Sequence, residues 1–130
     1  MTNPSSKVDH IIGRISTAEL ERRWEAVTRC MVEQDIAALL IRATNDYLGG
    51  YIKWFCGIPA STGYPVTLLF DQQARLSYIS QGFFGLDRTL EQADPVYRGV
   101  RRILGAPGYA SVDYSAPYEV DAVATALQEH

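Results

Sequence analysis

At 130 residues the chain is long enough for one domain with its own buried core, and we expect a flexible lead-in at residues 1–13 and a single domain over residues 14–130. Hydrophobic residues make up 47% of the sequence and charged residues 21%, which is ordinary for a folded globular protein. The net charge of −3 disfavours nucleic acid and anionic membranes as partners, and no apolar run is long enough to span a bilayer.

Residues 16–42 predict an amphipathic helix that runs almost directly into a strand. Ser16 and Glu19 have the spacing of a capping box, which marks the start of the helix. One apolar stripe follows at helical spacing, formed by Leu20, Trp24, Val27 and Met31. Residues 36–41 are then apolar without interruption and too short for a helix. We therefore expect a strand that is covered on both faces and lies near the centre of a sheet.

Residues 43–65 contain cap residues, glycines and an unusual number of aromatic side chains. The polar residues 43–46 predict a short helix around residues 47–48, which the two glycines at 49–50 should end. We interpret residues 51–65 as a long surface loop whose aromatic side chains either cover the core or contact a partner. The candidate substrate-access or subunit-contact residues are Tyr51, Trp54, Phe55 and Tyr64.

The two cysteines, Cys30 and Cys56, do not form a metal-binding cluster. Because the N-terminus carries no export signal, we expect the protein in the reducing cytoplasm with both thiols free, a disulfide between them being the alternative. Cys56 falls in the aromatic loop and is the thiol that we expect to be exposed. Lys53 is the only nearby residue that could activate it, so we expect an unreactive cysteine.

Residues 66–80 predict a β-hairpin. An apolar strand at residues 66–70 is followed by a polar turn at 71–74 and a returning antiparallel strand at 75–80. Together with the strand at residues 36–41, the hairpin predicts an α/β domain of three layers. In it a mixed sheet is flanked by helices on both faces, with the strands at 36–41 and 66–70 in the centre.

The segment after the hairpin carries weaker signals. Leu86 and Leu90 lie one helical turn apart, so we expect loop and helix over residues 81–94. Residues 97–104 fit either a helix or a short strand. The spacing of three apolar residues favours the helix, and they are Val100, Ile103 and Leu104.

The last segment predicts a helix after a short extended stretch at residues 110–114. Ser115 caps this helix and Pro117 lies in its first turn, where proline is well tolerated. The apolar stripe consists of Val120, Val123, Ala124 and Leu127. No stop signal precedes His130, so we expect the natural chain to continue.

The sequence offers no catalytic constellation. His10 lies in the lead-in and His130 is the last residue, so neither is a good metal ligand or general base. The acidic residues fall where the solvated face of a helix needs them. We therefore expect no catalytic residue and no metal ligand in this chain.

The order of the elements is the most informative feature. A charged helix at residues 21–31 leads into residues 35–41, followed by Asn45-Asp46-Tyr47-Leu48-Gly49-Gly50-Tyr51 and by the strand pair at 66–80. This order, over residues 20–130, resembles the N-terminal domain of the creatinase, aminopeptidase P and prolidase family of pita-bread metallohydrolases. The sequence departs from the family at residues 47–51, where the family pattern is Tyr-Leu-Thr-Gly-Phe, and its loop at residues 54–64 is longer.

The resemblance implies a parent enzyme whose C-terminal catalytic domain is absent from this chain. In that domain two aspartates, one histidine and two glutamates would hold two divalent metal ions, which generate hydroxide and polarise the scissile carbonyl. This chain would be the non-catalytic N-terminal domain of an Xaa-Pro aminopeptidase or dipeptidase. It would contact its own catalytic domain and a second subunit, as in a dimer, and help to wall the active site. The alternatives are the corresponding domain of a creatinase-like enzyme, or an autonomous α/β module that binds a ligand or a protein.

Overall fold

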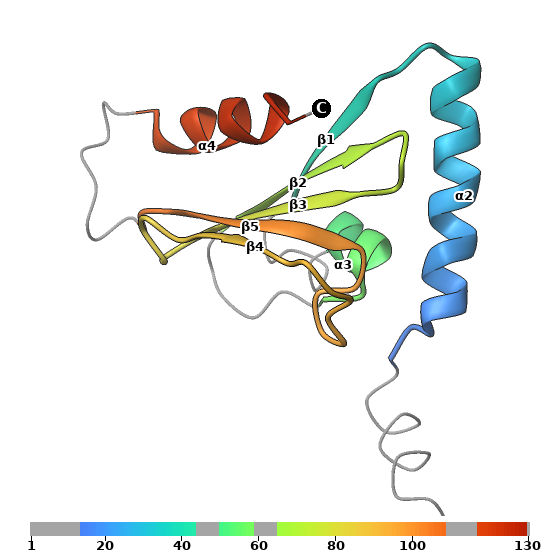
Figure 1. Ribbon diagram of the computed structural model, residues 1–130, viewed down its shortest axis with the longest axis horizontal. Helices are drawn as coiled ribbons and strands as arrows, with labels where there is room; N and C mark the ends of the chain where they lie inside the picture. Colours follow the sequence, from blue (N-terminus) through green and yellow to red (C-terminus); the bar gives the residue numbers. More distant parts are fainter. Residues whose placement is uncertain (1–13, 44–49, 59–64, 109–116, 130) are drawn as a thin grey trace, which may run out of the picture.

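The computed structural model describes residues 14–43, 50–58, 65–108 and 117–129. These residues form a five-stranded mixed sheet with helices on both faces, as Figure 1 shows. The predicted α/β class with a mixed sheet is therefore confirmed. The predicted lead-in at residues 1–13, the helix around residues 47–48 and the extended segment at 110–114 lie outside the described residues.

Helix α2 (Thr17–Glu33) is the helix that the sequence predicts. It begins at Ser16, whose hydroxyl accepts a hydrogen bond of 3.1 Å from the Glu19 N–H. The Glu19 carboxylate pairs with two arginines of the following turn, Arg22 and Arg23, each at 2.8 Å. Three residues of the predicted stripe are buried and one is partly buried against them, namely Leu20, Trp24, Met31 and Val27. The predicted apolar stripe is therefore confirmed.

The sheet has the strand order β1-β2-β3-β5-β4. Strands β1 (Ala38–Ala43), β2 (Val66–Asp71) and β3 (Leu76–Gln81) pair antiparallel in sequence order, which confirms the predicted hairpin. Strand β5 (Val100–Ala106) runs parallel to β3, and the short β4 (Asp87–Thr89) pairs antiparallel with β5 at the far edge. The one parallel pair makes the sheet mixed.

Strand β1 lies at an edge of the sheet, so the prediction of a central strand covered on both faces is wrong. It pairs with β2 alone among the strands described. Leu39 and Ile41 pack against the large core, whereas Leu40 points the other way and is 60% exposed. An apolar run indicates that a strand has a buried face. It does not indicate how many neighbours the strand has.

The helix expected within residues 81–94 is wrong, because the segment contains β4. Of the two alternatives for residues 97–104, the short strand is confirmed by β5, and the helix that the spacing favoured is wrong. The pairing of β5 with β3 shifts register between Leu76 and Ser77, where an extra residue of β5 is accommodated. Such an irregularity lets Val100 and Ile103 face the same core although they are three residues apart. The three-residue spacing of Val100 and Ile103, which favoured a helix, is therefore produced by the bulge in β5.

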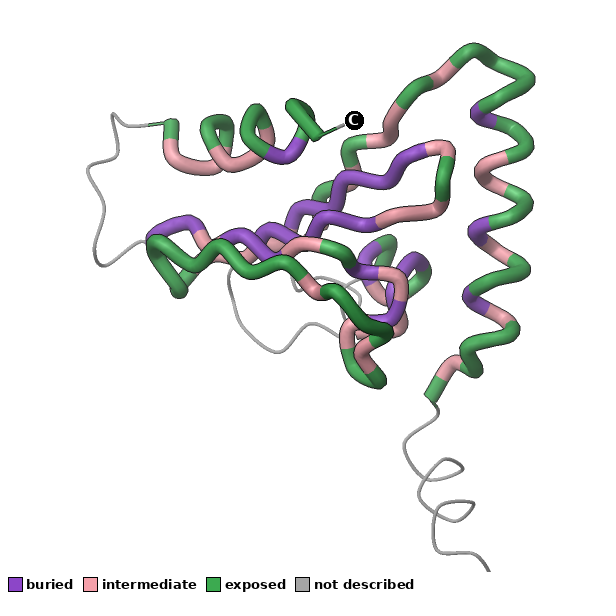
Figure 2. Tube along the Cα trace, in the orientation of Figure 1, coloured by how far each residue is buried: buried purple, intermediate pink, exposed green. Residues whose placement is uncertain are grey.

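Two cores lie on opposite faces of the sheet, and Figure 2 shows the buried residues concentrated along the strands and along one side of α2. The larger core joins the sheet to α2 and to the short helix α3 (Gly50–Cys56). The smaller core lies under α4 (Tyr118–Leu127), which begins after Pro117. No described helix combines the length and the apolar character needed to cross a lipid bilayer.

Helix α4 packs on the sheet through a different face from the predicted one. Ala126 is fully buried, and Ala122 and Val123 pack beside it. Val120 and Leu127, which the predicted stripe includes, are 66% and 46% exposed. The small alanine side chains let the helix lie close to the strands, so the packed face is set by size as well as by hydrophobicity.

Candidate functional site

Helix α3 occupies residues 50–56, so the interpretation of a surface loop over residues 51–65 is wrong for residues 51–56, and residues 59–64 lie outside the described residues. Gly50 is its first residue, and the helix that Gly49 and Gly50 were expected to end lies outside the described residues. Gly57 follows the last turn with a φ of +72°, and its N–H donates to the Lys53 carbonyl at 2.8 Å, as at many helix ends. Three residues at helical spacing are buried and hold the helix in place, namely Ile52, Phe55 and Cys56.

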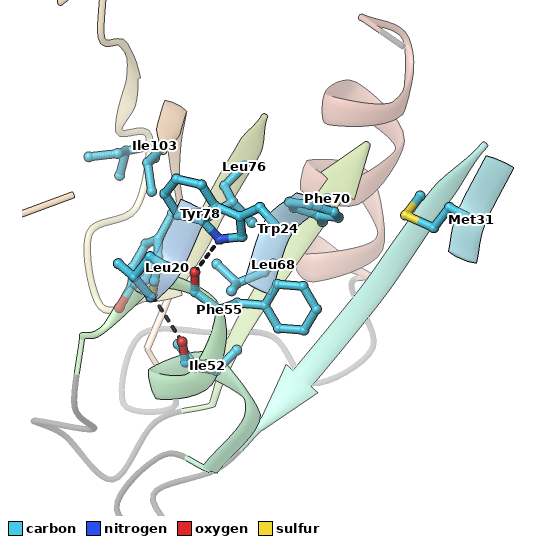
Figure 3. Close-up of a cluster of buried hydrophobic side chains, with 12 residues drawn as sticks. Leu20, Trp24, Met31, Ile52, Phe55, Leu68, Phe70, Leu76, Tyr78 and Ile103 are labelled. Atoms are coloured by element: carbon cyan, nitrogen blue, oxygen red, sulfur yellow. Dashed lines mark hydrogen bonds between the residues drawn. The ribbon is translucent and has the colours of Figure 1, made fainter. Parts of the chain in front are cut away.

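The structure separates the four predicted contact residues. Tyr51 is 71% exposed and Trp54 is 39% exposed. Phe55 is buried in the large core, with its ring centroid 5.3 Å from that of Phe70, and Figure 3 shows it among the core side chains. Tyr64 lies outside the described residues. Tyr51 and Trp54 are therefore the part of the candidate site that reaches solvent, and we call them the aromatic surface.

Helix α2 fixes the C-terminal half of α3 through two side chains. The Trp24 indole N–H donates to the Phe55 carbonyl at 2.7 Å, a buried hydrogen bond that is drawn in Figure 3. Arg23 donates to the Trp54 carbonyl at 3.0 Å and places its guanidinium carbon 5.2 Å from the Trp54 ring centroid. Arg23 is itself held by the Glu19 carboxylate. The Trp54 ring is thus exposed to solvent and contacted by a cation on one side.

The exposure of the two thiols differs from the prediction. Both are free, as expected, but Cys56 is buried and Cys30 is exposed. The Cys56 thiol donates to the Ile52 carbonyl at 3.1 Å, and burial raises its pKa to about 11. A thiol in this setting stays protonated at neutral pH and is a poor nucleophile.

A polar cluster that sequence reasoning missed joins α4 to the sheet. Glu119 binds Arg42 of β1 through two hydrogen bonds of 2.9 and 3.0 Å, and it also accepts a hydrogen bond from Thr67 of β2. The Gln81 amide of β3 approaches the same carboxylate at 3.5 Å. These residues come from four elements, so no local sequence pattern marks them. The evident effect of the cluster is to orient α4.

Two cavities open beside α2. The larger, about 560 Å³, lies between the middle of the helix and the turn after β2, and Trp24, Thr28 and Gln72 are among its lining residues. The smaller, about 410 Å³, lies at the start of the helix and is lined by Arg14, Ile15, Ser16, Thr17 and Arg98. Neither was predicted, because each wall combines segments that are distant in sequence.

The described residues do not fit a metal centre. Within these ranges no group of three or more histidine, cysteine, aspartate or glutamate side chains lies close enough to hold an ion. The two metal ions that the resemblance implies therefore find no ligand set in the part of the chain that the structure describes, and we derive no catalytic step from it.

The chain was also compared with known proteins. No family model, no curated protein and no solved structure matches it. The function is therefore inferred from the geometry of the aromatic surface and of the smaller cavity, and from the sequence resemblance.

Proposed function

We propose that this chain is the non-catalytic N-terminal domain of a cytoplasmic, metal-dependent Xaa-Pro peptidase-like hydrolase. In this proposal the domain contacts its own catalytic domain and a second subunit, and the aromatic surface of Tyr51 and Trp54 is the contact. The observation that carries the proposal is that Trp54 is exposed while Arg23 contacts both its ring and its carbonyl. The two divalent metal ions of the enzyme belong to the catalytic domain.

An ordered, exposed tryptophan is suited to binding a partner. Tryptophan, tyrosine and arginine dominate the binding energy of many protein interfaces, because they bury much area in a few side chains. A side chain that is already fixed loses little entropy when the partner binds. Tyr51 and Trp54 are residues of these types and are exposed. The contacts of Arg23 with Trp54 reduce the entropy that is left to lose when a partner binds.

The order of the described elements also supports the proposal. A charged helix, an apolar strand, a short helix and a β-hairpin follow one another as α2, β1, α3, β2 and β3. This is the order in which the motifs of the resemblance occur. This support comes from the order of the elements, and the segment at residues 44–49 lies outside the described residues.

The self-association of the 130-residue chain tests the contact. We expect sedimentation velocity to show a concentration-dependent dimer that the double variant Tyr51→Ala, Trp54→Ala loses. The matched control is Phe83→Ala, Phe84→Ala, which removes two aromatic rings that are 66% and 72% exposed elsewhere on the surface. A chain that stays monomeric at every concentration, or a dimer that both double variants weaken equally, would contradict the proposed contact.

The absence of catalysis by this domain alone is tested separately. We expect no hydrolysis of an Xaa-Pro dipeptide by the purified chain, with or without added Mn²⁺. Metal-dependent cleavage by the 130-residue chain would overturn the assignment of catalysis to another domain. The coding sequence downstream of His130 supplies the remaining test, because the proposal requires aspartate, histidine and glutamate metal ligands there.

A further inference from the structure

Arg98 occupies an unusual position between three elements. It lies just before β5, it is only 8% exposed, and its guanidinium donates to the Ile15 carbonyl at the start of α2. A second, longer contact of 3.4 Å reaches the Thr17 hydroxyl. On its other side the guanidinium lies against Gly57 at the end of α3, where a Cβ would stand only 2.4 Å from the Arg98 Nη2. The guanidinium is therefore packed between the backbone at Ile15 and the backbone at Gly57.

The hydrogen-bonding needs of this buried cation are not met. The Arg98 Nε–H is buried and has no partner. Among the described residues no carboxylate pairs with Arg98, and a second cation, Arg14, also acts on it electrostatically. Burial and this neighbouring positive charge both lower the pKa of Arg98, so the charged form is disfavoured here. Arginine is rarely buried without a counter-charge, because removing the ion from water is costly.

The smaller cavity lies directly beside this cation. Arg98 and Arg14 supply two positive charges to its wall, and Ser16 and Thr17 supply hydroxyl groups. The same residues form the start of α2, a helix of 17 residues whose first N–H groups have no partner within the helix. The start of a helix carries a partial positive charge, which adds to that of the two arginines.

The acidic residue in the first turn of α2 does not neutralise these two arginines. Glu19 lies in the first turn of α2, but its carboxylate is bound by Arg22 and Arg23. These hydrogen bonds lower the pKa of Glu19 to about 2, so its charge is already matched by two cations. Among the described residues, the cavity between Arg14 and Arg98 therefore carries excess positive charge, although the whole chain is acidic.

We propose that this cavity binds a small oxyanion, the phosphate or carboxylate group of a ligand, between Arg14, Arg98 and the start of α2. Guanidinium groups match the geometry of both kinds of oxyanion, and a helix start offers N–H donors to them. The anion supplies the counter-charge that Arg98 lacks. This inference does not depend on the aromatic surface or on the proposed hydrolase.

The test is a titration of the 130-residue chain followed by amide NMR at constant ionic strength. Inorganic phosphate and acetate are the two probes, with sodium chloride as the balancing salt. We expect saturable shifts of the Thr17 backbone N–H and of the Arg98 Nε–H. Saturation by phosphate alone would assign the site to phosphate groups, and saturation by acetate would assign it to carboxylates. If neither probe gives a saturable shift at these two groups, the proposal is wrong.

Two variants that each remove one positive charge distinguish a specific anion site from nonspecific electrostatic attraction. Arg14→Gln removes an exposed arginine from the cavity wall, and we expect it to weaken anion binding about tenfold, which corresponds to one lost charge-assisted hydrogen bond. Arg29→Gln removes the same charge from an exposed position farther along α2 and should leave the affinity unchanged. Equal weakening by both variants would overturn the proposal. Arg98→Lys keeps the charge but replaces the planar guanidinium by an ammonium group, so it should also bind more weakly.

Discussion

Trp24 joins α2 to both α3 and the sheet, and replacing it by alanine tests whether this junction stabilises the fold. Its side chain is 8% exposed, and its indole N–H makes the buried hydrogen bond of 2.7 Å to the Phe55 carbonyl. Its ring lies so close to Gly99 that a Cβ there would be 2.7 Å away. Truncation of a buried large aromatic residue usually costs about 3–5 kcal/mol. We expect Trp24→Ala to lower the free energy of unfolding by that amount.

The conservative variant Trp24→Phe divides this loss into its two parts. Phenylalanine keeps much of the apolar contact but cannot donate to the Phe55 carbonyl, which then stays buried without its partner. Leaving one buried polar group unsatisfied costs about 1–3 kcal/mol, so the phenylalanine variant should fall between the wild type and alanine. A stability of Trp24→Phe equal to that of Trp24→Ala would mean that the hydrogen bond, and not the packing, holds the junction.

Urea unfolding followed by far-ultraviolet circular dichroism measures these differences by linear extrapolation. Val32→Ala is the matched control, because Val32 belongs to the same helix and is 60% exposed. Exposed substitutions of this kind usually change stability by less than about 0.5 kcal/mol. A loss below about 1 kcal/mol for Trp24→Ala, well under the usual range for a buried aromatic, would refute the reasoning.

Three other outcomes follow from the buried groups. At mildly alkaline pH a thiol reagent should label Cys30 and spare Cys56 until the protein unfolds, and labelling of both in the folded state would contradict the buried position of Cys56. The free energy of unfolding should fall as the pH rises from about 9 to 11, because burial raises the pKa of Cys56 from 9.0 to about 11 and the folded state keeps a proton that the unfolded state loses. Burial also raises the pKa of Tyr78 and acts in the same direction, so constant stability over this range in a pH-dependent urea titration would be the contrary result. Glu119→Gln should weaken the bond to Arg42 and speed hydrogen exchange in α4 but not in α2, as measured by mass spectrometry, and equal acceleration in both helices would show general destabilisation instead.

Helix α2 and the hairpin of β2 and β3 could be predicted because their signals are local. Ser16 caps the helix three residues before Glu19, and the buried side follows from the spacing of Leu20, Trp24 and Met31. The hairpin strands are rich in apolar residues and lie on either side of a polar turn. In each case the residues that decide the structure lie within a few positions of one another, so one sequence suffices to find them.

The other elements depend on contacts that a local pattern does not contain. The bulge in the pairing of β5 with β3 gives Val100 and Ile103 a helix-like spacing in a strand. In α3 the glycines and aromatic residues indicated a loop, although Ile52, Phe55 and Cys56 carry the helical period. Seven residues are too few to form a stable helix alone, so packing against α2 and the sheet decides the outcome.

The smaller cavity shows why the candidate anion site was missed. Arg98 donates to the carbonyl of Ile15, 83 residues earlier, and in the sequence it is one arginine among several near the start of β5. Its burial depends on Gly57, which has a φ of +72° and no side chain where the guanidinium lies. Gly99, with a φ of +76°, similarly leaves room for the Trp24 ring. A side chain at either glycine would strain the backbone and displace a buried group. Gly57 and Gly99 therefore leave the space in which α2, α3 and the start of β5 pack around Arg98 and Trp24.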